Sequence, residues 1–222
     1  MENEEKTSEQ LTKEQYPQKA DKLFIDETDS AKGAWIKNPA GGFFLYSEGY
    51  KNAGKLLLDK CLAQDSDNYM RNSLVYPMIF NYRQYIELTL KSLIDEIKKR
   101  NGGGTFQDIH ILSTQWNEYK SLLKKIKCSF YEDIMTNVGK LIKEFEEIDK
   151  ISMCFRYPVT KAPNREDSLK MSTIDLENFK TVMEKLVAFF EAQIDMINDF
   201  HDKKEKKGKK CILFSWLKKK KD

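Results

Sequence analysis

An arginine and a glutamate, Arg83 and Glu87, lie four residues apart inside an apolar helical stripe. At about 100° per residue, the segment 76–97 places its large apolar side chains on one side, with both charged side chains among them. The stripe consists of Ile79, Tyr82, Ile86, Leu90, Leu93 and Ile97, extended by Tyr76, Phe80 and Ile94, and the polar side consists of Asn81, Gln84, Lys91, Ser92, Asp95, Lys98 and Lys99. Burial of an ion pair costs desolvation that attraction only partly offsets, so this spacing indicates either a core ion pair or a functional site.

A histidine would supply acid–base chemistry near neutral pH. The chain has two histidines, His110 and His201. His110 follows a glycine-rich segment and precedes a predicted helix, so it is the better candidate for a general acid or base. Its alternative role is to cap that helix or to complete a hydrogen bond in the core.

A second group of polar side chains lies in the segment 149–158, between two predicted helices. It contains Asp149, Arg156 and Tyr157, which suit the binding or orientation of an anion such as phosphate. Arg83 would offer a second guanidinium if the two segments meet. Alternatively, the aromatic residues of this loop pin it to the helices and Arg156 pairs with an acid.

The sequence predicts neither a metal site nor a cofactor. It lacks the His and Cys spacings of metal ligands, and the acids Glu144, Glu146, Glu147 and Asp149 are typical of a solvated helix end. The glycine run 102–104 lacks the Gly-Lys-Ser/Thr of a phosphate-binding loop, so it is interpreted as a linker.

Five amphipathic helices would position these residues, and no alternating strand pattern competes with them. We expect helices over residues 43–62, from 68–73 to 100, over 113–127, over 130–148, and from Ser172 onward, with Ser172 as the N-cap and Asp175 as an early acid. Pro77 should lie in the first turn of the second helix or kink it. Gly49 and Gly54 weaken the first helix, or else allow a neighbour to approach closely. The predicted fold class is an all-α bundle of about five helices.

Charge divides the chain into three parts. Residues 1–30 carry nine acids against four lysines and are predicted to be a disordered acidic segment, whereas residues 203–222 carry ten lysines against two acids around the apolar island 211–217. Residues 31–202, the predicted single helical domain, are close to neutral. Any electrostatic contact with nucleic acid must therefore come from a local patch or from the tail.

Export is not expected. No stretch approaches the roughly 20 apolar residues of a membrane span, and residues 1–10 contain no apolar signal segment. The four cysteines are widely separated, which favours reduced thiols and a cytoplasmic location.

Taken together, these motifs over about residues 43–200 resemble a group of bacterial HEPN-like helical proteins (higher eukaryotes and prokaryotes nucleotide-binding). The resemblance rests on Tyr76-Pro77, on Tyr82 to Leu88 with Leu90-Lys91, on His110 near Trp116, and on Asp149 with Phe155-Arg156-Tyr157-Pro158. It implies a helical bundle that dimerises. It also implies metal-independent cleavage of RNA, or binding of RNA or nucleotide, in defence, toxin–antitoxin or stress systems.

The sequence departs from the active-site pattern of that superfamily, an Arg followed about four to six residues later by a His. Arg83 and His110 are separated by 26 residues. Ribonuclease activity would need a rearranged site, with His110 as acid or base, Arg83 or Arg156 stabilising phosphate charge, and Glu87 orienting Arg83.

The alternative is a helical module without catalysis that binds an antitoxin or another protein. The lysine-rich tail adds three open possibilities: contact with an anionic membrane surface, contact with RNA, or no binding role.

Overall fold

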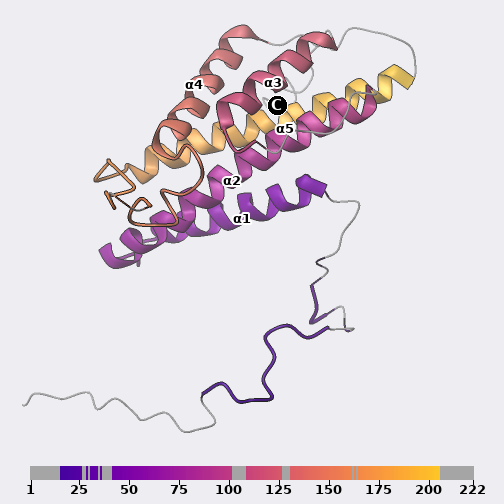
Figure 1. The fold of residues 1–222 in the computed structure, drawn as a ribbon. Coiled ribbons are helices and arrows are strands. Elements are labelled where there is room, and N and C mark those ends of the chain that lie inside the picture. Colours follow the sequence, from indigo (N-terminus) through magenta and orange to yellow (C-terminus); the bar gives the residue numbers. More distant parts are fainter. Residues whose placement is uncertain are drawn as a thin grey trace, which may run out of the picture. The chain divides into compact units, whose positions relative to one another are not determined.

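A computed structural model describes residues 16–26, 29, 31–34, 36, 42–101, 109–126, 131–161, 163 and 165–205, without the side chains of residue 100 and of residues 200–205. The chain divides into two compact units, Met1–Pro39 and Ala40–Asp222. The described part of the second unit contains five helices, labelled in Figure 1: α1 (Gly42–Cys61), α2 (Asn68–Arg100), α3 (Leu112–Lys125), α4 (Glu132–Ile148) and α5 (Leu176–Glu205). Within the described residues the β structure is limited to one isolated bridge, between Val159 and Asp167.

The all-α prediction with about five helices is confirmed. The first unit is described only in part, and its described apolar residues Leu23, Phe24 and Ile25 are strongly exposed. The predicted disorder of residues 1–15 and the roles considered for the tail 206–222 lie outside the described residues, as does the glycine run 102–104.

Helix α2 is the element around which the others assemble. It packs against α1, α3 and α5, while α3 also packs against α4 (Figure 1). Asp67 caps its N-terminus, since the carboxylate accepts a hydrogen bond of 2.6 Å from the backbone N–H of Met70. Pro77 lies inside the helix, beyond the first turn. The carbonyl of Pro77 accepts a 2.7 Å hydrogen bond from the side-chain amide of Asn81.

The last helix begins four residues later than predicted. Its first residue is Leu176, and the carboxylate of Asp175 accepts a 3.0 Å hydrogen bond from the backbone N–H of Asn178. Asp175 therefore performs the capping role that the sequence assigned to Ser172, because a cap must precede the first helical residue directly.

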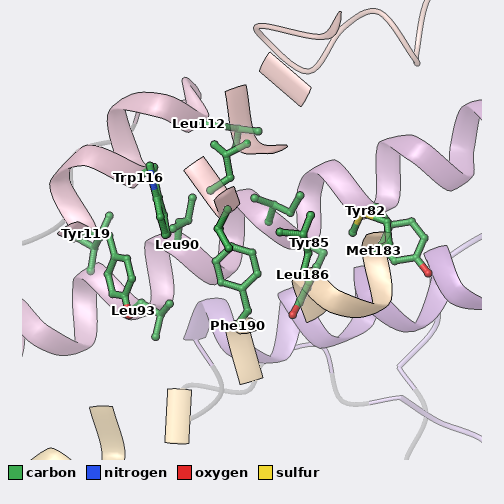
Figure 2. Close-up of a cluster of buried hydrophobic side chains, with 14 of the residues drawn as sticks. Tyr82, Tyr85, Leu90, Leu93, Leu112, Trp116, Tyr119, Met183, Leu186 and Phe190 are labelled. Carbon is green, nitrogen blue, oxygen red and sulfur yellow. The ribbon is translucent and has the colours of Figure 1, made fainter. Parts of the chain in front are cut away.

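The hydrophobic core is built mainly on α2, α3 and α5. Aromatic rings from these helices meet edge to face, as for Tyr85 of α2 and Phe190 of α5, whose centroids are 6.0 Å apart (Figure 2). Most of the predicted α2 stripe is buried: Ile79, Tyr82, Ile86, Leu90, Leu93, Ile94 and Ile97 are each no more than 5% exposed. Its first members differ from the prediction, since Tyr76 is 48% exposed and Phe80 is half-buried. Among the described residues, no helix has the length and apolar content needed to cross a membrane.

Two glycines mark places where a neighbouring ring comes very close. A Cβ on Gly54 of α1 would lie 3.1 Å from the ring of Tyr82, so this glycine does allow close packing. A Cβ on Gly139 of α4 would lie 2.8 Å from Nε1 of the buried Trp116 on α3. Gly49, also in α1, has nothing within 4 Å of that position.

The same substitution should therefore have opposite effects at two helical glycines. Gly49→Ala is expected to stabilise the fold by about 0.5–1 kcal/mol, because alanine restricts the unfolded chain and favours helix. Gly139→Ala is expected to destabilise it by about 1–3 kcal/mol, because the added methyl group displaces the Trp116 ring. Urea denaturation of the two variants measures both effects, and stabilisation by Gly139→Ala would contradict the packing at Trp116.

Candidate polar site

Arg83 is completely buried and lies at the meeting point of three segments. Its Nη1 donates to Glu87 Oε2 at 2.7 Å, one turn along α2. Its Nε donates to the carbonyl of Asp149 at 3.0 Å, at the end of α4, and its Nη2 donates to the carbonyl of His110 at 2.9 Å, just before α3. A longer contact of 3.4 Å joins Nη2 to the carbonyl of Lys150. The predicted burial of the Arg83–Glu87 pair is confirmed.

These contacts define the chemical role open to Arg83. A guanidinium has five N–H donors in a planar fork, and here that fork is directed at one carboxylate and three backbone carbonyls. The side chain is 0% exposed, so a phosphate in solvent does not reach it. Arg83 therefore positions groups of the protein itself, through its contacts with Glu87 and with the two covering segments.

Glu87 receives three positively charged or polar donors. In addition to Arg83, it contacts Nδ1 of His110 at 2.7 Å and Nζ of Lys91 at 3.1 Å, both through Oε1. Burial alone would raise the pKa of Glu87, but the hydrogen bonds from Arg83, His110 and Lys91 together lower it below the ordinary value of 4.5. Glu87 is therefore held as a carboxylate.

A lowered pKa makes the stability of the fold depend on pH. The ionised form of Glu87 stabilises the native state above its unfolded pKa of about 4.5, and that contribution is lost as the pH falls through the lower folded value. We expect Glu87→Gln to have a lower free energy of unfolding than the wild type near pH 7. In acid the free energies of unfolding of the two proteins should become more similar, because the wild type loses the contribution of the carboxylate.

Denaturant titrations at several pH values measure that difference. Glu144→Gln, on the exposed side of α4, is the matched control and should leave the curve unchanged. A Glu87→Gln curve parallel to that of the wild type down to about pH 3 would contradict the assignment.

Asp149 is buried, contrary to its interpretation as part of a solvated helix end. Its side chain is 0% exposed, and Oδ1 accepts the backbone N–H groups of Met153 at 2.6 Å and Cys154 at 3.1 Å. Oδ2 lies 4.0 Å from Nε of Arg83. Glu146 is not simply solvated either, because its carboxylate accepts hydrogen bonds from the backbone N–H and the hydroxyl of Ser113 at the start of α3. The helix end is used to anchor the following loop and α3.

His110 is the exposed member of the cluster. Its side chain is 59% exposed, while that of Glu87, which it contacts, is 3% exposed. It lies two residues before α3, as the sequence predicted. The backbone there is held in place by Arg83 through the His110 carbonyl, and the amide of Gln115 donates to the carbonyl of Ile109. The structure thus brings together Arg83, Glu87, His110 and Asp149.

Arg156 and Tyr157 lie outside this cluster. The guanidinium of Arg156 is exposed, donates from Nε to the carbonyl of Ser152 at 2.6 Å, and lies 5.5 Å from the ring centroid of Phe80. Tyr157 is 51% exposed, whereas the neighbouring Phe155 is buried and anchors the loop. The segment 149–158 does meet Arg83, through the carbonyls of Asp149 and Lys150. The contacts of Arg156 are with Ser152, Met153, Phe80 and Tyr157 instead.

Lys91 belongs to the site although its sequence position suggested the polar, solvent-facing side. It is only 4% exposed, and its amine contacts Glu87 one turn away. Gln84, from the same predicted polar side, donates to the hydroxyl of Ser152 at 2.6 Å. This side of α2 is covered by the loop after α4. A charged residue four positions after a buried glutamate is the sequence signal that would have suggested Lys91.

Metal binding is not indicated in the part of the chain that the structure describes, which holds no group of three His, Cys, Asp or Glu side chains able to share an ion. Comparisons with protein-family models, with curated proteins and with solved structures gave no match to this chain.

Proposed function

We propose that this chain is a HEPN-like protein that binds RNA or nucleotide and cleaves RNA without a metal ion, as a cytoplasmic homodimer in a bacterial defence, toxin–antitoxin or stress system. The five-helix architecture and the convergence of Arg83, Glu87 and His110 support the proposal. The cellular setting and the dimer rest on the sequence resemblance alone.

One observation carries the catalytic part of the proposal: an exposed imidazole whose Nδ1 contacts a buried carboxylate at 2.7 Å. A carboxylate in this position fixes the orientation and tautomer of a histidine, leaving Nε2 as the proton-exchanging atom. This is the arrangement of a general base with its orienting acid.

The reaction that suits such a pair is attack of an RNA 2′-hydroxyl on the adjacent phosphate. His110 takes the 2′-hydroxyl proton as the new O–P bond forms, and the bond from phosphorus to the 5′-oxygen breaks. The products are a 2′,3′-cyclic phosphate and a 5′-hydroxyl, with a proton donated to the leaving oxygen by water or by the protonated imidazole. The reaction written in this way needs neither an oxidant nor a metal ion.

The experiment is incubation of the purified chain with end-labelled single-stranded RNA in the presence of a metal chelator. Fragments that end in a 2′,3′-cyclic phosphate are expected. Intact RNA at high protein concentration would overturn the catalytic proposal.

A second function, a helical module that binds a protein partner such as an antitoxin, is supported by the four contacts of Arg83 within the fold. An arginine used in this way stabilises the packing of loops and needs no substrate. This function predicts no RNA turnover, with partner binding that is sensitive to exposed aromatic residues. In this reading the tail of residues 203–222 tethers the module to an anionic membrane surface, which flotation with anionic vesicles would detect.

A further inference from the structure

The surface beside the polar site combines positive charge with exposed aromatic rings. Between residues 68 and 86, the first half of α2 contains no aspartate or glutamate, and neither does the loop from residue 150 to residue 161. That loop carries Lys150, Arg156 and Lys161, all exposed. Carboxylates make up 35 of the 222 residues, and the acidic residues Glu166 and Asp167 pair through their backbone with Thr160 and Val159 at the far end of the loop. The acid-free part of the loop is therefore the part around Lys150 and Arg156, which forms a local patch that suits a polyanion.

Arg156 lies close to two aromatic rings in this patch. Its guanidinium carbon lies 5.5 Å from the ring centroid of Phe80 on α2 and 5.6 Å from that of Tyr157. Its Nε is fixed by the carbonyl of Ser152. Its Nη2 also donates to Sδ of Met153 at 2.9 Å. Two rings and two hydrogen bonds orient the planar cation before any ligand arrives.

Tyr76 extends the same surface along α2. It lies one helical turn before Phe80, so the two side chains are neighbours on one side of the helix, and Tyr76 is 48% exposed. We call Tyr76, Phe80, Arg156 and Tyr157 the aromatic platform.

The aromatic platform leads directly to the proposed catalytic histidine. One turn after Phe80, Gln84 donates to Ser152 of the loop, and within the next turn Glu87 contacts His110. Tyr76 and Glu87 are 11 residues apart, which corresponds to about 16 Å along a helix axis. A few nucleotides of an extended strand cover that distance.

We propose that the aromatic platform binds single-stranded RNA by stacking bases on Tyr76, Tyr157 and the plane of Arg156, and thereby places a neighbouring phosphate at His110. Stacking on aromatic and guanidinium planes is the usual way in which proteins hold unpaired bases, while base-paired RNA keeps its base faces covered. The inference rests on the proposed RNA function and names its substrate class as the single strand.

Binding is best measured with a 2′-O-methyl oligouridylate of about twelve nucleotides, which spans the platform and cannot be cleaved by 2′-hydroxyl attack. Fluorescence anisotropy of the labelled oligomer gives the Kd. Tyr76→Ala and Arg156→Ala are each expected to raise the Kd about five- to tenfold. Arg156→Ala should also reduce the slope of log Kd against log salt concentration by about one.

Arg156→Lys separates stacking from charge. It should keep the salt dependence of the wild type and still raise the Kd, because an ammonium group lacks a stacking plane. Lys143→Ala is the matched charge control: its side chain is 69% exposed on α4, outside the platform, and the Kd should not change. Thermal unfolding followed by circular dichroism verifies that each variant is folded.

Unchanged Kd values for Tyr76→Ala and Arg156→Ala would overturn the inference, as would equal competition by a double-stranded RNA of the same length. Such a result would assign the exposed rings to a protein partner. The two proposals fail separately. Platform-dependent binding without any RNA cleavage removes catalysis alone, whereas cleavage that is insensitive to Tyr76→Ala and Arg156→Ala removes the platform alone.

Discussion

Arg83→Ala is expected to lower the free energy of unfolding by about 3–5 kcal/mol. The substitution leaves the buried carboxylates of Glu87 and Asp149 without their shared cation. It also removes the donor from the carbonyls of His110 and Asp149. Lys91 and His110 still contact Glu87 in this variant, but the desolvation of the two buried carboxylates is compensated less, and that cost exceeds what the intact ion pair contributes. Urea denaturation followed by circular dichroism measures the loss.

Arg71→Ala provides a matched control on the same helix. Arg71 donates to the carbonyl of Ser66 and to the side chain of Asn68, at a half-buried position near the start of α2. Its removal should cost less than about 1 kcal/mol. Arg83→Lys should not restore the stability of the wild type, since one ammonium group cannot reach both the carboxylate and the carbonyls. A cost of Arg83→Ala no larger than that of Arg71→Ala would contradict the assignment.

The catalytic proposal predicts that loss of His110 raises the activation free energy of RNA cleavage by about as much as Arg83→Ala lowers the free energy of unfolding. His110→Ala is expected to slow RNA cleavage by about a hundred- to ten thousandfold, the range typical of a lost general acid or base. Glu87→Gln should slow cleavage at least about tenfold, because an amide cannot fix the same imidazole tautomer. Single-turnover cleavage of labelled RNA measures both effects.

The chain contains one other histidine, so His201→Ala is the matched control and should keep the rate of the wild type. The Kd for the uncleavable oligomer should be unchanged in His110→Ala, because the aromatic platform is intact. Cleavage that survives His110→Ala would place the chemistry elsewhere or trace it to a contaminant.

The sequence predicts much of this architecture because helical periodicity is a local property. The apolar stripe of α2 and the burial of Arg83 and Glu87 follow from their spacing alone. The predicted start of α5 is four residues too early because Ser172 and Asp175 both have side chains that can cap a helix. The geometry shows that Asp175 is the cap, since its carboxylate accepts the hydrogen bond from the backbone N–H of Asn178.

The polar site was harder to predict because its contacts join distant segments. The contact between Glu87 and His110 depends on where the chain re-enters before α3, and periodicity does not encode that path. The sequence predicts solvent exposure for Lys91 because it lies on the polar side of the helix, and for Asp149 because acidic residues precede it. They are buried because the loop after α4 and the segment before α3 cover this side of α2.

The contacts of Arg83 also limit how early this side of α2 can fold while the chain is being synthesised. Its partners lie 27 and 66 residues further along, in segments that leave the ribosome well after α1 and α2. A nascent chain that ends before Asp149 can pair the first two helices, but it must leave Arg83 hydrated and that side of α2 open. The early helical pair therefore cannot bury Arg83 by itself, and this side of α2 is covered only once the segment before α3 and the loop after α4 have been made.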